Sequence, residues 1–398
     1  MTAPKLAPAS GAPEPDHTEL APVGGRLVTR FTAALGLLVV VLAAVLAVRF
    51  VRGIGAVTNL NDGYPWGIWI AYDVVVGTAL GASGFTVAFV TYILNRGSYH
   101  PMVRPALLTA LFGYLMAAAS VFFDIGRYWE AWHIFLPGYV QFNSVLAEVA
   151  LCIMAYTVVL FIEFLPAVLE RFGLRQIRKR LDRVLFVFIA LGVLLPTMHQ
   201  SSLGSMLLVF GPQIDPLYQT RWLPALFLTS TIGMGLAAVV IEGSVSSLAL
   251  RRPLERELLG KLMKVGRAVI TAFLIIRFAD LWHRGILPQL LEPTGVAIMF
   301  WIETALFATP LVVMWGKAGA RPRRFFIAAM AMAFAGMLYR IDAYLVAYHT
   351  GAGWHYFPSL GELAVSIGLV AFEILAFILA IRLLPVLPRP SAKERDHG

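Results

Sequence analysis

Ten apolar stretches, each long enough to cross a lipid bilayer as a helix, recur along this chain of 398 residues. A spanning helix needs about 20 consecutive apolar residues. With 59% hydrophobic and 14% charged residues, the chain is also too apolar for a soluble domain to bury. It is therefore predicted to be an all-α integral membrane protein. The predicted spans cover residues 27–51, 66–94, 105–123, 144–169, 184–199, 222–249, 264–282, 294–315, 325–348 and 360–384.

Two polar tails flank the predicted membrane domain, which covers residues 26–388. Residues 1–25 are rich in Pro, Ala and Gly and contain no apolar run, which predicts a disordered tail. The first span lies far from the start and has no A-x-A-like exit, so it is expected to be retained, not cleaved as a signal peptide. Residues 389–398 form a second short tail.

The distribution of basic residues predicts how the spans are oriented. If the chain starts in the cytoplasm, the inner segments from residue 26 onward contain 22 lysines and arginines, and the outer loops contain 5. Short loops rich in Lys and Arg stay in the cytoplasm. Both ends of the chain are therefore expected there. The net charge of +9 reflects these loops, which argues against a nucleic-acid surface.

The cysteine and histidine content limits which redox groups the chain can hold. Cys152 is the single cysteine, so no disulfide, iron–sulfur cluster or c-type haem is expected. A b-type haem usually needs two histidines that face each other within the bilayer. All eight histidines fall in tails, loops or the ends of predicted spans. The chain is therefore expected to hold no haem.

Residues 194–205, LLPTMHQSSLGS, interrupt an apolar stretch with Pro196, Thr197, His199, Gln200 and two adjacent serines. Side chains that form hydrogen bonds are costly near hydrocarbon, so such a cluster predicts a functional site. The alternative is a hydrated helix end. We expect the cluster to lie where the fifth span ends at the outer surface.

Several predicted spans contain charged residues close together in sequence. Arg277 lies three residues before Asp280, and Arg340 lies two residues before Asp342. Charged groups in a membrane are expected to face the protein interior and to pair. We predict that each couple forms a buried ion pair.

Three glutamates in predicted spans have no basic residue within a helical turn: Glu148, Glu242 and Glu303. Each is predicted to be protonated, to pair across helices, or to transfer protons. Glu148 and His199 lie at similar depths near the outer side, which predicts one shared pocket. Tyr114 lies at mid-depth, whereas Arg104 and Glu242 lie near the cytoplasm. These three are expected to mark a polar path to the pocket, although a mid-span tyrosine is often only a packed aromatic.

The predicted outer loops mix aromatic residues with aspartates and histidines. A single tryptophan there is often part of the interfacial aromatic belt. The dense mixture instead predicts an interaction surface and a site on the outer side. Its members are Asp62, Tyr64, Trp66, Asp124, Arg127, Tyr128, Trp129, Trp132, His133, Trp354 and His355.

These residue types suit quinone reduction, which needs hydrogen-bond donors for two carbonyl oxygens, a proton source and an apolar cleft for the tail. His199, Glu148 and Tyr114 would supply the first two, and side chains of the spans would supply the cleft. The chain contains no G-x-S-x-G, P-loop or H-E-x-x-H motif, so nothing indicates hydrolytic chemistry.

Five motifs occur in order and resemble those of a known family: NLNDGYPWGIWIAYD, ILNRGSYHPMVRPALL, DIGRYW, LLPTMHQSSLGS and FWIE. Together they are similar to the membrane subunit of hydrogenase-2-type nickel–iron hydrogenases, within the NrfD-like (polysulfide reductase membrane subunit) superfamily. The similarity runs from about residue 53 to residue 388.

The resemblance implies ten transmembrane helices, with spans 2–5 and 6–9 forming two four-helix bundles flanked by spans 1 and 10. It implies a haem-free site near the outer face for menaquinone or ubiquinone. The site would map to Asp62, Trp66, Tyr114, Asp124, Glu148 and His199.

The implied partners are a ferredoxin-like iron–sulfur subunit on the outer side and the large and small nickel–iron hydrogenase subunits. The implied location is the bacterial cytoplasmic (inner) membrane, with lipid around the spans. Proton translocation is a further possibility that this resemblance raises.

Two other functions stay open at this point. Polysulfide, nitrite and tetrathionate reductases use similar subunits, and these would oxidise quinol. An ion or solute transporter would also use buried Glu and Arg side chains in ten helices. A transporter usually has broken helices at matching positions of its two halves, and the sequence shows no clear set.

Overall fold

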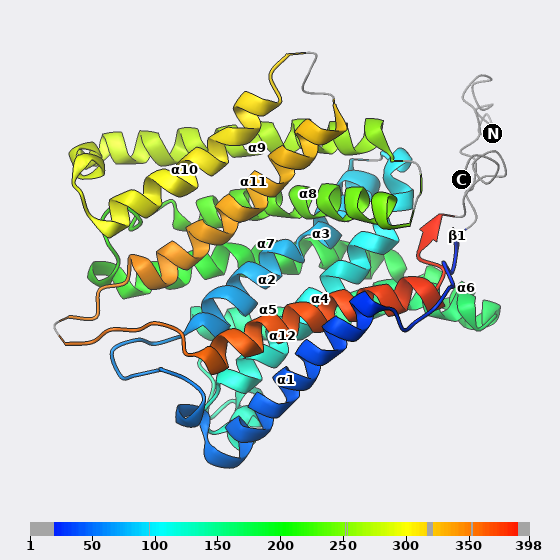
Figure 1. The fold of residues 1–398 in the computed structure, drawn as a ribbon, viewed down its shortest axis with the longest axis horizontal. Coiled ribbons are helices and arrows are strands. Elements are labelled where there is room, and N and C mark those ends of the chain that lie inside the picture. Colours follow the sequence, from blue (N-terminus) through cyan, green and yellow to red (C-terminus); the bar gives the residue numbers. More distant parts are fainter. Residues whose placement is uncertain are drawn as a thin grey trace, which may run out of the picture.

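The computed structural model describes residues 20–94, 96–250, 252, 254–316, 321–351 and 353–388. Within these residues, nine helical segments are long and apolar enough to cross a membrane. The predicted seventh span is also a helix, α9 (Arg256–His283), but it carries too many charged residues to count by composition. The apolar stretches therefore located all the long helices, which lie side by side in Figure 1.

The other long helices are α1 (Arg30–Arg52), α4 (His100–Asp124), α5 (Val145–Arg171), α7 (Leu185–Phe210), α8 (Leu223–Ala249), α10 (Gly295–Val313), α11 (Pro322–Ile341) and α12 (Leu360–Leu383). The second predicted span is built from four pieces: η2 (Trp69–Val74), α2 (Val75–Leu80), α3 (Ser83–Ala88) and η3 (Phe89–Ile93). Shorter helical turns are η1 (Ile54–Ala56), η4 (Gly97–Tyr99), η5 (Tyr128–Phe135), α6 (Arg175–Asp182), η6 (Gly211–Gln213), η7 (Leu287–Leu291) and η9 (Asp342–Val346).

We divide the helices into two groups and one pair. The first helix group consists of η2 to η3, α4, α5 and α7, and the second helix group consists of α8 to α11. The two groups meet where α8 packs against α7, α3 and α2. The remaining helices, α1 and α12, pack against each other along one side of the first group (Figure 1).

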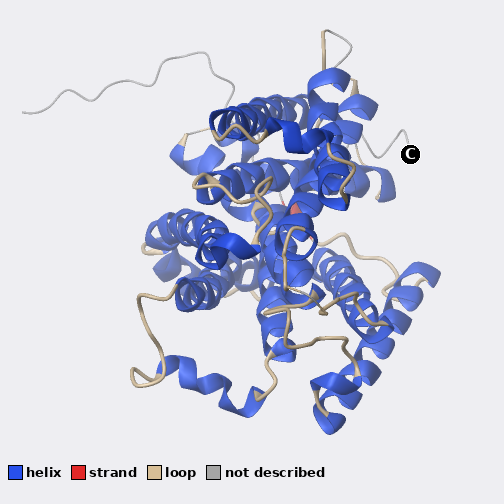
Figure 2. Cartoon of the chain, turned by 90° about the vertical axis from the view of Figure 1, so that its left-hand side faces the viewer, coloured by secondary structure: helices blue, strands red, loops and turns tan. Residues whose placement is uncertain are grey.

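The two ends of the helices differ in character. We call the end that carries residues 53–68, 125–144 and 211–222 the aromatic face, and the opposite end, with residues 172–184, the basic face. Figure 2 views the molecule from the aromatic face, where long loops and short helical turns cover the helix ends. The tryptophans Trp129 and Trp132 in η5 are exposed there.

Glycines let the second span approach α4 closely. A Cβ atom added at Gly84 would lie 2.7 Å from Cβ of Ala110, and one at Gly81 would lie 3.1 Å from the Tyr114 ring. A larger residue at either position would force the two helices apart. The glycines thus let the second span pack close to Tyr114.

The prediction that the fifth span ends at His199 is wrong, because α7 continues for three more turns to Phe210. Its hydroxyl groups are satisfied within the helix. Oγ1 of Thr197 donates to Val193 O (2.7 Å) and Oγ of Ser205 donates to Ser201 O (3.2 Å). Since these polar side chains bond to carbonyls one turn earlier, they do not end the helix.

The two ends of the described chain meet at the basic face. Strand β1 (Leu20–Ala21) pairs antiparallel with β2 (Leu387–Pro388). Beside this pair, the Val23 N–H donates to Ile381 O (3.0 Å). The strand β1 lies inside the segment predicted to be a tail, while residues 1–19 and the tail at 389–398 lie outside the described residues.

Candidate functional site

His199 is fully buried in the interior of α7 and forms the centre of the polar cluster. Its Nδ1 lies 3.1 Å from the carbonyl oxygen of Leu195, which can only accept, so Nδ1 carries the proton. In the neutral ring, Nε2 is then an acceptor. It lies 2.9 Å from the Tyr114 hydroxyl on α4 and 3.0 Å from Nε2 of Gln200.

Gln200 connects His199 to the second helix group. Its Nε2 also donates to Oγ1 of Thr78 on α2 (2.9 Å), and its Oε1 accepts from Oγ1 of Thr231 on α8 (2.7 Å). All four side chains are fully buried. Four helices therefore contribute to one hydrogen-bonded cluster around His199.

Glu148 lies on α5 beside the same stretch of α7. Its Oε1 accepts from Oγ of Ser202 (2.7 Å), which lies three residues after His199. The structure thus brings Glu148 close to the His199 cluster, with a serine one helical turn away as its direct partner. Glu148 is half-buried, whereas His199 and Tyr114 are not exposed at all.

Trp66 anchors the start of the second span to the second helix group. Its Nε1 donates to the Tyr344 carbonyl (2.8 Å), and its ring packs against Phe210, Tyr344 and Tyr348. The Tyr344 hydroxyl in turn donates to Leu203 O on α7 (2.8 Å). Trp66 is therefore buried among these aromatic side chains. Asp62 is exposed on the aromatic face.

Asp124 is the last residue of α4, at the aromatic face. Its Oδ1 is buried and has no hydrogen-bond partner among the described residues. Nearby, the fully buried Arg49 of α1 donates through Nε to Phe123 O (2.7 Å) and through Nη2 to Ile125 O. Arg49 thus binds the C-terminal end of α4 through the backbone carbonyl groups of Phe123 and Ile125.

Arg104 and Glu242 lie toward the basic face, as predicted. Arg104 donates to Pro385 O and to a carboxylate oxygen of Glu170, both at 2.7 Å. Glu242 accepts from Oγ1 of Thr109 on α4 (2.7 Å). No direct hydrogen bond joins Glu242 to Tyr114 in the described part of the chain, so the two predicted halves of the polar path stay separate there.

The predicted pairing of Arg277 with Asp280 is wrong. Arg277 pairs across helices with Glu303 on α10 (2.5 Å), whereas Asp280 pairs with Arg284 (2.6 Å). The Glu303 carboxylate also accepts from the Tyr218 hydroxyl (3.1 Å). Burial and the neighbouring Glu303 raise the pKa of Tyr218, which therefore stays a hydrogen-bond donor.

The predicted pairing of Arg340 with Asp342 is also wrong. Arg340 is fully buried and donates instead to neutral groups on α8, including Thr231 Oγ1 (2.6 Å), Ser230 Oγ (3.2 Å) and Phe227 O (3.1 Å). Residues two positions apart on a helix do not face each other, which explains why sequence proximity misled the prediction.

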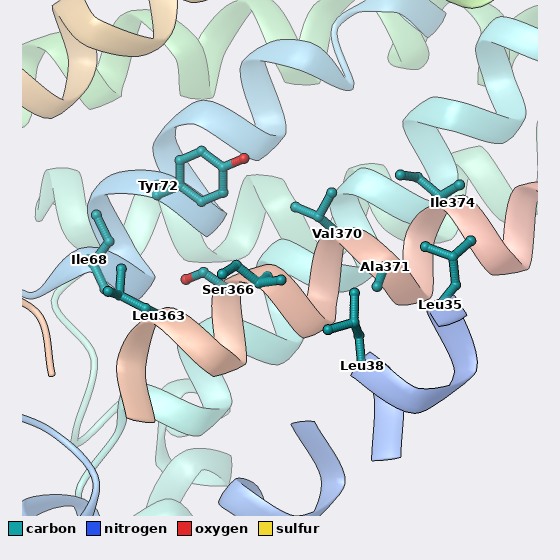
Figure 3. Close-up of a pocket in the computed structure, with 10 residues that line it drawn as sticks. Leu35, Leu38, Ile68, Tyr72, Leu363, Ser366, Val370, Ala371 and Ile374 are labelled. Atoms are coloured by element: carbon teal, nitrogen blue, oxygen red, sulfur yellow. The ribbon is translucent and has the colours of Figure 1, made fainter. Parts of the chain in front are cut away.

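A groove of about 390 Å³ opens between α1, η2 and α12. Figure 3 shows its mostly aliphatic lining, with the hydroxyl groups of Tyr72 and Ser366 as the polar exceptions. The lining residues are Leu35, Leu38, Ile68, Tyr72, Leu363, Ser366, Ile367, Val370, Ala371 and Ile374. Behind the lining, Ser366 donates to the buried carboxylate of Asp73 (2.8 Å).

Glu362 and its partners form a hydrogen-bonded cluster at the aromatic face, beside α12. Glu362 accepts from the Tyr356 hydroxyl (2.6 Å) and from the backbone N–H of Asn59 (2.9 Å). The Tyr356 oxygen also accepts from the Ile68 N–H (2.7 Å). Burial and the hydrogen bond to Glu362 raise the pKa of Tyr356 far above its usual range. The cluster therefore ties the loop before the second span to α12.

Reasoning from sequence did not assign roles to Gln200, Ser202 and Thr231. Gln200 and Ser202 lie within the conspicuous stretch 194–205, so their polarity was the available signal. Thr231 carried no such signal, because a threonine in an apolar span usually bonds to its own helix. It does so here, to Phe227 O (2.8 Å), besides bonding to Gln200.

Comparison with known proteins adds an independent line of evidence. The family model described as "Polysulphide reductase, NrfD" matches residues 56–350. The chain is 41% identical to the "Probable Ni/Fe-hydrogenase 2 b-type cytochrome subunit" of Escherichia coli, covering 95% of this chain and 97% of that protein. It is 27% identical to the "Menaquinone reductase, integral membrane subunit" of Nitratidesulfovibrio vulgaris, covering 86% of this chain and 88% of that protein.

Proposed function

This chain belongs to the polysulphide reductase NrfD family, and from this premise we propose that it is the quinone-reactive membrane subunit of a hydrogen:quinone oxidoreductase. The observation that supports this most is the buried cluster of His199, Tyr114 and Gln200, with Glu148 bonded to Ser202 one helical turn after His199. Its side chains offer hydrogen bonds and protons within an apolar protein. The similarity to a hydrogenase 2 subunit favours hydrogen as the electron source.

We propose that His199 and Glu148 supply protons for quinone reduction. Two electrons and two protons convert a quinone into a quinol. A neutral His199 has its proton on Nδ1, bound to Leu195 O, so Nε2 can donate only when the ring carries a second proton. His199 would therefore act as a proton carrier and not as a permanent donor. Glu148 would pass the other proton through Ser202.

The groove beside α12 supports binding of an isoprenoid tail. It is mostly aliphatic, and it opens between helices that would face lipid. The second span, which contributes Tyr72 to the groove, also carries Thr78, the partner of Gln200. A tail in this groove would thus lie against the span that reaches the His199 cluster.

The proposed complex would use the aromatic face for its redox partner. Exposed Trp129, Trp132 and Phe135 on that face suit protein contact. We propose that an iron–sulfur subunit, fed by large and small nickel–iron subunits, docks there on the outer side of a bacterial inner membrane. The full set of ten long helices, α9 included, would cross the membrane as two four-helix bundles flanked by α1 and α12, with both chain ends in the cytoplasm.

The proton supply would come from the cytoplasm through Glu242 and Arg104. Glu242 accepts from Thr109, which lies on α4 five residues before Tyr114. Buried water could bridge the remaining distance, since the groups on both sides are polar. Such a path would allow proton translocation to be coupled to turnover.

A b-type haem does not fit the His199 site, although the hydrogenase 2 relative is named as a b-type cytochrome subunit. Both ring nitrogens of His199 are engaged, Nδ1 by Leu195 O and Nε2 by Tyr114 and Gln200. An iron ligand needs one free ring nitrogen. We therefore propose quinone as the substrate and no haem in this chain.

The proposal is tested by comparing two electron acceptors in the purified complex. Glu148→Gln and His199→Ala should abolish hydrogen-driven quinone reduction while hydrogen uptake with an artificial acceptor continues. Ser201→Ala is the matched control, because the hydroxyl of Ser201 on the same helix bonds only to Met198 O among the described residues. If the two variants instead lower assembly and leave quinone turnover per complex unchanged, these residues serve only packing.

A further inference from the structure

Arg340 carries a charge that no carboxylate neutralises in the described part of the chain. Its guanidinium is fully buried, and its partners are neutral hydroxyl, carbonyl and thioether groups on α8 and α11. An arginine cannot release its proton, so the charge persists inside the protein. A buried, unpaired charge in a membrane protein is costly and marks a functional position by default.

A continuous series of hydrogen bonds leads from Arg340 to His199. Nη2 of Arg340 donates to Oγ1 of Thr231 (2.6 Å), and that hydroxyl donates to Oε1 of Gln200 (2.7 Å). Nε2 of Gln200 lies 3.0 Å from Nε2 of His199, which also faces the Tyr114 hydroxyl. All five side chains are fully buried. The series crosses from α11 through α8 to α7 and α4, joining the two helix groups (Figure 1).

The direction of each bond follows from the donor at one end. Arg340 can only donate, so Thr231 accepts from it, and the single Thr231 proton is shared between Gln200 Oε1 (2.7 Å) and Phe227 O (2.8 Å). The positive charge also favours the amide orientation that points the Gln200 oxygen toward it and the NH₂ group toward His199. An NH₂ group can donate to Nε2 of His199 only if Nε2 carries no proton. The ring is then protonated at Nδ1, which matches the bond to Leu195 O.

The reversed amide shows what Arg340 prevents. Turned end for end, Gln200 would present its oxygen to His199 and would favour a proton on Nε2. A neutral ring protonated there would direct the lone pair of Nδ1 at Leu195 O, only 3.1 Å away. It would also lose the acceptor that faces the Tyr114 hydroxyl. The two tautomers of His199 thus correspond to the two orientations of one amide.

We propose that Arg340 is a positioning residue that acts through Thr231 and Gln200 to keep Nε2 of His199 as the proton-accepting atom of the site. This rests on the proposed role of His199 in quinone reduction. It gives the second helix group a part in a site otherwise built from the first. A proton arriving at His199 would then always enter at Nε2, beside Tyr114.

The first test measures the tautomer of His199 directly. Complex labelled with ¹⁵N-histidine should give a signal that disappears in His199→Gln and that has the shifts of an Nδ1–H ring. Thr231→Val keeps the shape of the side chain but removes the hydroxyl relay, so this signal should be lost or move to the Nε2–H position. Thr231→Ser restores a hydroxyl and should keep the wild-type signal. Arg340→Met should resemble Thr231→Val, whereas Arg340→Lys, which still only donates, should stay closer to wild type.

A kinetic measurement separates positioning from packing. With hydrogen as donor, Thr231→Val should lower kcat for quinone by about tenfold or more, as for other partners that fix a histidine tautomer, with little change in KM. Thr231→Ser should recover most of this loss. An unchanged His199 signal in both Thr231→Val and Arg340→Met would overturn the proposal. If the signal changes but quinone turnover does not, the positioning inference holds and the proposed function of His199 fails.

Discussion

The buried ion pair between Arg277 and Glu303 makes a quantitative prediction about stability. Their side chains are 4% and 0% exposed, and the guanidinium is surrounded by aromatic rings, the nearest being Phe300 at 3.9 Å from its centroid. Replacing Glu303 by Gln keeps the shape and leaves the guanidinium without its counter-charge. Replacing Arg277 by Met leaves the carboxylate without one.

The two single variants should differ, because a carboxylate that has lost its partner can become neutral by binding a proton, whereas a guanidinium cannot become neutral. Breaking a buried pair typically costs about 3–5 kcal/mol, and Glu303→Gln should show this full cost because an arginine keeps its proton. In Arg277→Met, Glu303 can take up a proton. Its cost at pH 7 is then limited to about 4 kcal/mol, since an unfolded glutamate titrates near pH 4.3 and each pH unit is worth about 1.4 kcal/mol.

The sign of the pH effect distinguishes the variants. In Arg277→Met, the folded state binds a proton that the unfolded chain lacks, so the cost should shrink as the pH falls toward about 4.3. The cost of Glu303→Gln should not change in this way. Combining both substitutions removes the pair and should recover much of the loss.

The assay is unfolding of the purified subunit by dodecyl sulfate in mixed micelles, followed by tryptophan fluorescence at several pH values. Wild type, both single variants and the double variant give a complete double-mutant cycle. Single costs below about 1 kcal/mol, or strictly additive costs in the double variant, would refute the reasoning that this pair stabilises the second helix group.

Four further outcomes are expected. The purified subunit should show no stoichiometric Soret band, because both ring nitrogens of His199 are engaged; a stoichiometric band would contradict this. Crosslinks from the iron–sulfur partner should fall in residues 124–140 and 204–222. In the second of these segments, the accessible part begins at Gly211, after α7 ends. Crosslinks confined to the basic face would contradict the proposed topology. Gly204→Ala should destabilise the subunit by about 1–3 kcal/mol in the same unfolding assay, because its Cβ would meet the backbone carbonyl of Leu223, whereas Gly36→Ala meets nothing and serves as control. The pKa of Tyr356 is raised in the folded protein, so folding favours the protonated hydroxyl. The stability that this hydroxyl contributes should be present below about pH 10 and should be lost as the pH rises through the pKa of the folded state. Tyr356→Phe should show a smaller loss of stability at alkaline pH.

The sequence predicted the positions of the long helices well, because burial in lipid demands long apolar stretches whatever the tertiary structure. It failed where polar residues are compatible with a helix. Thr197 and Ser205 return their hydroxyl groups to carbonyls one turn earlier, so α7 continues where the prediction ended it. The prediction also began the seventh span at residue 264, whereas α9 begins eight residues earlier, at Arg256.

The predicted site residues illustrate the difference between depth and contact. Depth along the spans placed Glu148 level with His199 and placed Tyr114 deeper, at mid-depth. In the structure Tyr114 bonds directly to His199, and Glu148 bonds to Ser202, three residues further along α7. Partners on other helices do not follow from depth, so Glu303 was not identified as the partner of Arg277. Trp66, predicted from its motif to bind quinone, donates in the structure to the Tyr344 carbonyl. Its quinone-binding role stays a prediction.

The strand pair between β1 and β2, together with the contact between α1 and α12, effectively closes the chain into a ring. Leu20 lies directly opposite Pro388, so a short peptide could join the two without moving any helix. New termini could then be opened near Gly173, in the loop between α5 and α6. Every helix would keep its direction through the bilayer. A circularly permuted subunit of this kind would retain the whole His199 cluster while presenting its free ends at a different point of the same surface.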